Sequence, residues 1–181
     1  MPLYLLNGRR PTLPPDGFFW IAPNASVIGD VGLLVHSDAI VRGVRVTLKI
    51  SPELPPVHGD RVQVQQVILN LLLNAFDALE SRSTHDRVVV VSAALDDAEM
   101  IRVAVRDRGP GLAAEKLEKL FTPFFTSKRE GLGLGLSISR SIVQMHGGRI
   151  WAENNEDQGA TFYFTLPTGA TSEHTRARQQ P

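Results

Sequence analysis

Hydrophobic residues recur at helical spacing between residues 60 and 82, in the segment DRVQVQQVILNLLLNAFDALESR. At about 3.6 residues per turn, one face of this predicted helix is apolar, and a second face carries amides and a carboxylate. Asp60 can cap its start, and Gln63, three residues later, completes a capping-box pattern. The apolar face comprises Val64, Ile68, Leu71, Leu72, Ala75 and Leu79, and the polar face Gln63, Asn70, Asn74 and Asp77.

The polar face of this helix consists of unfavourable residue types. Asn and Asp are poor mid-helix residues because their side chains compete for backbone hydrogen bonds. A helix is therefore less stable with Asn70, Asn74 and Asp77 on one face than with a solvated face of Lys and Glu. The stretch fits two interpretations, a plain surface helix or a metal–phosphate site in which amide oxygens bind a divalent ion.

The rest of the hydrophobic pattern predicts strands and helices that do not alternate strictly. Alternating β-rich runs predict strands, two of which form an antiparallel hairpin with Asp96 and Asp97 in its connection. Gly147 and Gly148 end the last helix as C-terminal caps do. We therefore expect an α+β fold, a mixed sheet with helices on one face. The predicted strands are 44–50, 87–94, 101–106, 149–153 and 160–166, and the further helices 25–41, 112–120 and 134–146, with a loop over 121–130.

The two ends of the chain differ from its middle. Residues 1–24 contain five of the twelve prolines, which predicts an irregular arm, and residues 168–181 are polar, which predicts a disordered tail. The apolar patch 18–21 in the arm could dock on the domain, cover the surface of a missing neighbour, or be a remnant of a longer protein. One globular domain is expected over residues 25–167.

Composition limits the classes of function. With 181 residues, of which 43% are hydrophobic, the chain suits one domain with a substantial core. Lys plus Arg equals Asp plus Glu at 19 each, so nothing indicates binding to nucleic acid or direct contact with an anionic membrane. The absence of cysteine excludes disulfides and thiolate chemistry. No apolar run approaches the roughly 20 residues that span a bilayer, so we expect a soluble, cytoplasmic domain.

Asp107 begins a turn with two glycines. A carboxylate at the end of a strand can accept a hydrogen bond from the exocyclic amine of a base, and Gly109 and Gly111 allow the backbone to approach a flat ring. Taken alone, the motif is better explained as an ordinary Asp-Gly turn.

A second glycine motif leads into the helix predicted at 134–146. Gly131, Gly133 and Gly135 alternate, so successive backbone N–H groups can point at one anion, and the start of the helix adds partial positive charge. The pattern matches neither the Walker A loop nor the dinucleotide motif. It favours phosphate binding, with low specificity as an isolated motif.

Two further segments are candidates for binding. The run from Phe121 to Lys128 places three phenylalanines beside a lysine, which is typical of a mobile flap and equally of a loop packed on the core. Thr161 could present its hydroxyl to a base, although a plain strand residue explains it as well.

The order and spacing of these motifs are more specific than any one of them. They resemble, in register, the N, G1, F, G2 and G3 boxes of histidine-kinase catalytic domains, which belong to an ATPase superfamily shared with DNA gyrase, MutL and the heat-shock-90 chaperone. The resemblance covers roughly residues 27–167, and QQVILNLLLNAFDAL is most similar to the nitrogen-regulation and oxygen-sensing branch. The motifs are the asparagine helix, Asp107-x-Gly-x-Gly, Phe121-x-x-Phe-Phe, Gly131-x-Gly-x-Gly and Gly159-Ala-Thr-Phe.

This resemblance implies a fold and a set of site residues. The fold would be a two-layer α/β sandwich of the Bergerat type with a mixed, mostly antiparallel sheet. ATP and Mg²⁺ would be the cofactors, with Asn74 as the metal ligand, Asn70 supporting metal and phosphates, and Lys128 reaching the phosphates. Where many relatives have a phosphate-contacting lysine, this chain has Asp77, to which we assign no catalytic role. The nucleotide-binding residues would be Asp107, Gly109, Gly111, Gly131, Gly133, Gly135 and Thr161.

The implied activity is transfer of the ATP γ-phosphoryl group to a histidine on a separate dimerisation and phosphoacceptor domain, with a response regulator as an indirect partner. None of the five histidines lies in an acceptor-like motif, so we expect no autophosphorylation. Related ATP-hydrolysing proteins place a water-activating glutamate where this chain has Asn70, and an amide cannot accept that proton. Slow or negligible hydrolysis is expected. An anti-sigma-type serine kinase and a non-catalytic nucleotide-binding module are the alternatives.

Overall fold

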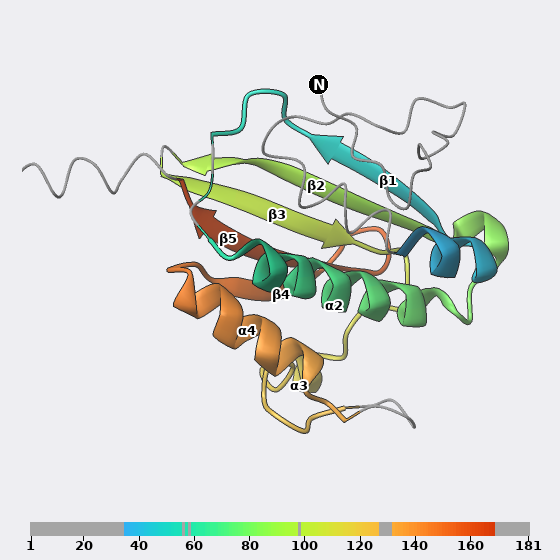
Figure 1. Cartoon of the computed structure of the whole chain (residues 1–181). Helices are drawn as coiled ribbons and strands as arrows, with labels where there is room; N and C mark the ends of the chain where they lie inside the picture. The colour runs from blue at the N-terminus through green and yellow to red at the C-terminus, as the bar shows by residue number, and fades with distance from the viewer. Residues whose placement is uncertain (1–34, 56, 58, 98, 127–131, 169–181) are drawn as a thin grey trace, which may run out of the picture.

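The computed structural model describes residues 35–55, 57, 59–97, 99–126 and 132–168, which form a five-stranded sheet with helices against it (Figure 1). The strand order is β1-β2-β3-β5-β4; β1 and β2 are parallel and all other neighbours antiparallel. The predicted mixed, mostly antiparallel sheet is confirmed. The strands are β1 (Arg45–Ile50), β2 (Val88–Asp97), β3 (Met100–Arg106), β4 (Ile150–Asn154) and β5 (Ala160–Pro167).

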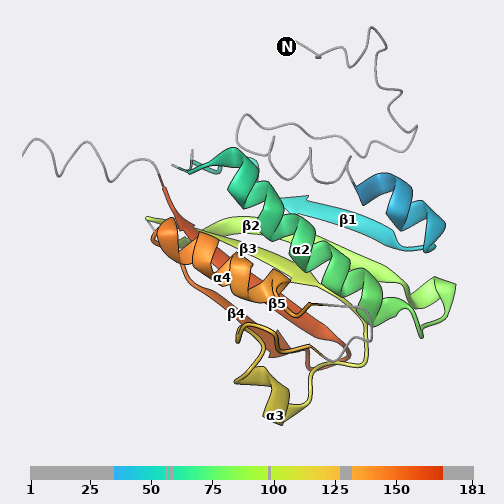
Figure 2. The ribbon, with the colours of Figure 1, turned by 60° about the horizontal axis from the view of Figure 1, so that its bottom comes forward.

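Two long helices, α2 (Arg61–Leu79) and α4 (Gly135–Met145), lie side by side over the same face of the sheet (Figure 2). This arrangement confirms the α+β sandwich. Burial alternates along β3, where Ile101, Val103 and Val105 are buried, because successive side chains of a strand point to opposite faces. The described fold also contains two short elements, η1 (Thr84–Asp86) and α3 (Ala114–Leu117), and the helical residues 35–41.

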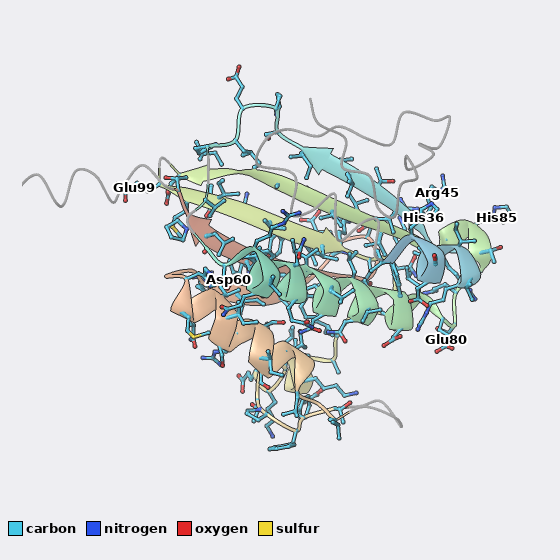
Figure 3. All side chains as sticks on the ribbon, viewed as in Figure 1. His36, Arg45, Asp60, Glu80, His85 and Glu99 are labelled. Carbon is cyan, nitrogen blue, oxygen red and sulfur yellow. The ribbon has the colours of Figure 1, made fainter. Side chains whose placement is uncertain are left out.

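The predicted helix at 60–82 is confirmed as α2. All six residues assigned to its apolar face are buried, together with Val67 and Phe76. Asp60 caps the helix, since its Oδ1 accepts from the backbone N–H of Val62 at 2.8 Å and of Gln63 at 3.1 Å. Figure 3 shows Asp60 and Glu80 marking the two ends of α2.

The prediction that Gln63 completes a capping box is wrong. The backbone N–H of Asp60 donates to Nε2 of His146 at 2.9 Å, where a capping box would use the side chain of Gln63. Nδ1 of His146 lies 2.8 Å from the carbonyl oxygen of Ile142, so Nδ1 carries the proton and Nε2 accepts. A single imidazole therefore links the last turn of α4 to the first turn of α2.

Replacing His146 with Ala is expected to lower the free energy of unfolding by about 0.5–1.5 kcal/mol, because one bond at each helix end is lost. Chemical denaturation of the full chain measures the change. His85, an exposed residue of η1, provides the control. Equal stability of the two Ala variants would contradict a stabilising role for the imidazole.

Three other expectations differ from the structure in detail. The helix predicted at 112–120 shortens to α3, and it starts later than predicted because the side chain of Asn154 bonds both the N–H and the carbonyl of Leu112, at 2.7 and 2.8 Å, which holds that residue outside a helix. Asp96 and Asp97 belong to β2, not to the connection after it. Of the helix predicted at 25–41, residues 35–41 are helical, and 25–34 lie outside the described residues.

Thr168, assigned to the tail, is part of the fold. It forms an isolated bridge with Val57, and its N–H donates to the carbonyl of Glu99 at 2.7 Å. The predicted arm 1–24 and residues 169–181 lie outside the described residues. Within the part of the chain that the structure describes, no helix is both long and apolar enough to cross a membrane.

Candidate functional site

Asn70, Asn74 and Ala78 form a row along α2, because residues four apart lie one above the other on a helix. At 1.5 Å per residue the row is about 12 Å long. Loops from distant parts of the chain contact its two ends, and Asn74 lies one turn from each contact.

The first end of the row meets the start of α4. Nδ2 of Asn70 donates to the carbonyl oxygen of Gly135 at 3.2 Å, and a Cβ added to Gly135 would lie 3.7 Å from the Asn70 amide carbon. Leu134, at the N-cap of α4, makes no capping hydrogen bond with its side chain. The first N–H groups of α4 have no acceptor within the helix, so they are suited to bind an anion beside Asn70.

The loop before α4 is closely packed on the segment that contains the phenylalanines. The N–H of Phe124 donates to the carbonyl of Gly133 at 3.0 Å. Gly133 has φ +66°, and a Cβ there would lie 2.7 Å from the carbonyl carbon of Phe124, so only glycine fits. Phe124 itself has φ 64° and is 73% exposed. The predicted flap and phosphate loop are therefore joined through the backbone. Lys128 and Gly131 lie outside the described residues.

The second end of the row meets the turn after β3. Asp107 is 3% exposed, and its Oδ1 accepts from the N–H of Gly109 at 2.7 Å and of Ala160 at 3.3 Å. Burial raises the pKa of Asp107, and these two hydrogen bonds oppose the rise. A Cβ on Gly109 would lie 3.0 Å from both Cβ and the carbonyl oxygen of Ala78. The turn thus packs directly on α2.

Thr161 lies next to Asp107 but is held by a residue that the sequence did not indicate. Its Oγ1 donates to Oδ1 of Asn155 at 2.6 Å, and Nδ2 of Asn155 donates to the carbonyl oxygen of Asp107 at 3.0 Å. Asn155 therefore fixes both residues. Its only signal in the sequence is a polar turn composition between two strands.

Gly111 shapes the other side of this turn. It has φ +81°, and a Cβ there would lie 2.9 Å from Oδ1 of Asn154. Arg82, just beyond α2, donates through Nη2 to the carbonyl oxygen of Gly109 at 2.9 Å. The turn is thus held from α2 and from the end of β4.

Asp77 forms an ion pair with Arg42, with Nη1 and Oδ1 2.7 Å apart. Arg42 follows the helical residues 35–41. The pair is partly exposed, so its net contribution to stability is small. The ion pair gives the Asp77 carboxylate a structural partner.

The candidate metal site consists of amides. Among the described residues no three His, Cys, Asp or Glu side chains cluster as a metal site. Oδ1 of Asn70 accepts one hydrogen bond, from Nε2 of Gln66 at 2.9 Å, and an amide oxygen has a second lone pair. An amide oxygen is a hard ligand, and it fits Mg²⁺ that would be bound mainly through phosphate oxygens and water.

Two hollows occur in the part of the chain that the structure describes. One hollow of about 410 Å³ lies between Leu117, Arg140 and Trp151, and another of about 380 Å³ lies between Val41, Phe76 and Arg87. No predicted nucleotide-binding residue lines either hollow. The contacts that the structure shows along α2 are those of Gly135 with Asn70 and of Gly109 with Ala78, each about one helical turn from Asn74.

Gly159 packs so closely against the Asp107 turn that it leaves no room for a side chain. It has φ +82°, and a Cβ there would lie 2.3 Å from the carbonyl oxygen of Asp107. We expect Gly159→Ala to destabilise the protein more than Gly43→Ala, because Gly43 has a similar φ of +63° but a Cβ there would make only an ordinary contact, 3.6 Å from Cγ2 of Thr84. The φ strain alone costs about 1–2 kcal/mol. Thermal unfolding of both variants measures the difference, and equal losses would contradict the steric argument.

Comparisons with known proteins show which family the chain belongs to. The family described as histidine kinase-, DNA gyrase B- and HSP90-like ATPases matches residues 59–170. The sensor protein FixL of Bradyrhizobium diazoefficiens is 44% identical over 143 residues, which cover 79% of this chain and 28% of FixL. The sensor histidine kinase ZraS of Escherichia coli K12 is 37% identical over 138 residues, covering 76% of this chain and 29% of ZraS. The chain thus spans less than a third of these relatives.

Solved structures of histidine kinases are also similar to this chain. The catalytic domain of histidine kinase ThkA has a TM-score of 0.69 and 34% identity, covering 78% of this chain and 90% of that domain. ThkA in complex with the response regulator protein TrrA gives a TM-score of 0.65 and 32% identity over 78% of this chain and 39% of that one. The chain therefore belongs to the family of histidine kinase-, DNA gyrase B- and HSP90-like ATPases, within which its relatives are sensor histidine kinases.

Proposed function

We propose that this chain is the ATP-binding catalytic part of a two-component sensor histidine kinase, and that it transfers the γ-phosphoryl group of ATP to a histidine on a separate dimerisation domain. One observation carries the proposal: the row Asn70–Asn74–Ala78 is contacted at one end by Gly135 and at the other by Gly109. The sensor-kinase names of FixL and ZraS support it.

Each end of the row has its own task in this proposal. Asp107 accepts a hydrogen bond from the adenine amine, beside the turn of Gly109 and Gly111 and near Thr161. Asn74 ligates Mg²⁺ and Asn70 supports the phosphates. At the phosphate end, the backbone of Gly131, Gly133 and Gly135 and the side chain of Lys128 complete the site.

The chemistry that these residues can perform is positioning and neutralisation of charge. When bound, Mg²⁺ neutralises phosphate charge. A neutral histidine nitrogen is already nucleophilic, so the domain needs no strong base. The amide of Asn70 cannot take a proton from water, and its Nδ2 already donates to Gly135 and Ser139. Transfer to histidine is therefore favoured over hydrolysis.

The phosphoacceptor domain requires a docking surface near the phosphates. Three exposed apolar side chains belong to the start of α4 and to the two loop segments joined next to it: Phe124 is 73% exposed, Leu132 79% and Ile138 46%. Such a group of large apolar residues is typical of an interaction site. We place the histidine-bearing helix here. A response regulator then takes the phosphoryl group in the cytoplasm, where ATP is available.

Incubation with radiolabelled ATP tests the activity. We expect no label on the chain alone, and label on a histidine when the dimerisation domain of a related sensor kinase is added. ATP hydrolysis by the chain alone should remain near the uncatalysed background. Label on the isolated chain, or transfer only to a serine of a small protein, would contradict the proposal. Failure of the chain to bind ATP with Mg²⁺ would leave a non-catalytic module.

A further inference from the structure

Ser139 lies in the second turn of α4 and is fully buried, although serine is a polar residue. Its Oγ donates to the carbonyl oxygen of Gly135 at 2.9 Å and accepts from Nδ2 of Asn70 at 3.2 Å. The same Nδ2 donates to the Gly135 carbonyl at 3.2 Å. Both N–H groups of the Asn70 amide thus point at α4. One acceptor is the backbone carbonyl of Gly135, and the other is the side-chain hydroxyl of Ser139.

This network fixes the direction of the Asn70 amide. A carbonyl oxygen can only accept, so the nitrogen of Asn70 must face Gly135, and the oxygen must face the opposite way. On that side Nε2 of Gln66 donates to Oδ1 at 2.9 Å, which confirms the orientation. One lone pair of Oδ1 remains for a ligand.

The network also fixes the start of α4 against α2. Gly135 is the first residue of α4, and the N–H groups of this turn are the ones suited to bind phosphate. Without the hydroxyl, the amide of Asn70 would retain a single acceptor on α4. Both the amide oxygen and the helix start would then have more freedom to move.

We propose that Ser139 is a positioning residue for phosphoryl transfer: its hydroxyl fixes the Asn70 amide and holds the first turn of α4, whose N–H groups are suited to bind the triphosphate, against α2. The proposal rests on the proposed function and adds a residue that does not itself touch the nucleotide. Its contribution concerns the phosphates and Mg²⁺, and not the adenine end, where Asp107 lies on the far side of Asn74.

The test compares Ser139→Ala with Ser141→Ala in the full chain. Ser141 is the matched control, because its Oγ makes the same kind of bond, to the carbonyl of Ser137 at 3.1 Å, but the residue is exposed. Calorimetric titration with ATP and Mg²⁺ should show affinity weakened about two- to tenfold in Ser139→Ala and unchanged in Ser141→Ala. Binding of adenosine should be the same in both.

A double-mutant cycle excludes a merely structural role. In an Asn70→Ala background, Ser139→Ala should cause less than a twofold further loss, because the hydroxyl acts through the amide. Should Ser139→Ala not fold, Ser139→Cys, which keeps a weak donor, enters the same cycle with a smaller expected loss. Any of three results would overturn the proposal. The folded Ser139 variant could bind ATP with Mg²⁺ as tightly as wild type, or lose as much affinity for adenosine as for ATP. Alternatively, Ser139→Ala could reduce ATP affinity as much in the Asn70→Ala background as in wild type.

A measurement without nucleotide separates this inference from the proposed function. The side-chain amide resonance of Asn70 in the ligand-free chain should shift in Ser139→Ala and stay in place in Ser141→Ala. An unmoved resonance contradicts the positioning role directly. If the resonance shifts but the chain binds no ATP, the proposed function is contradicted, whereas the contact between Ser139 and Asn70 is supported.

Discussion

Replacing Asp107 with Asn should weaken ATP binding by about 1–3 kcal/mol, or roughly five- to 150-fold, while the protein stays folded. Asn keeps one oxygen that can accept from the N–H groups of Gly109 and Ala160, as Oδ1 of Asp107 does. The second carboxylate oxygen becomes an NH₂ group, which cannot accept from the adenine amine. Calorimetric titration with ATP measures the loss, and unchanged affinity would remove Asp107 from the site.

The stability of the same variant relative to wild type is predicted to depend on pH. Burial raises the pKa of Asp107, so the folded protein holds this proton more tightly than the unfolded chain does. Between the unfolded and the folded pKa the native state binds more protons, and its stability therefore falls as pH rises through that window. Asp107→Asn removes this titration. Its free energy of unfolding relative to wild type should improve from acid toward neutral pH, and a constant difference would contradict the pKa shift.

Replacing Asn74 with Ala should reduce phosphoryl transfer to a histidine-bearing domain by on the order of 10²-fold or more, because a group that stabilises developing phosphate charge is removed. ATP binding without Mg²⁺ should change little, whereas the increase in affinity caused by Mg²⁺ should disappear. Titrations with and without a chelator, combined with single-turnover transfer of label, separate these two effects.

Gln63→Ala is the matched control for Asn74→Ala, since Gln63 is also half-buried on α2 but lies three turns earlier, outside the row. It should bind and transfer as wild type does. An Asn74 variant that keeps the full effect of Mg²⁺ on affinity would show that the metal is held elsewhere.

Much of this architecture could be predicted because its signals are local. The spacing of apolar residues along α2 predicted its buried face, and the alternation in β3 matches its alternating burial. In β5 the residue types alternate, but the strand is buried along nearly its whole length, including Thr161 and Thr165. Asp60 indicated the helix start. The resemblance supplied the order of the glycine motifs, and the structure brings Gly109 and Gly135 to the two ends of one row on α2.

The contacts that hold the site together could not be predicted in this way. Each joins residues far apart in the chain: Asp60 with His146, Asn70 with Ser139, and Asp107 with Asn155. Neither periodicity nor turn composition specifies which distant polar group will satisfy a buried one. The shortening of α3 has the same cause, because Asn154 takes both backbone groups of Leu112.

A titration of the ¹⁵N-labelled chain with ATP and Mg²⁺, followed by its backbone amide resonances, examines the shared nucleotide site most directly. If a single nucleotide spans the row on α2, the resonances of Gly109, Gly111, Gly133 and Gly135 shift together and saturate at one equivalent. Shifts confined to one pair of glycines, or two groups that saturate at different nucleotide concentrations, would show that no common site exists.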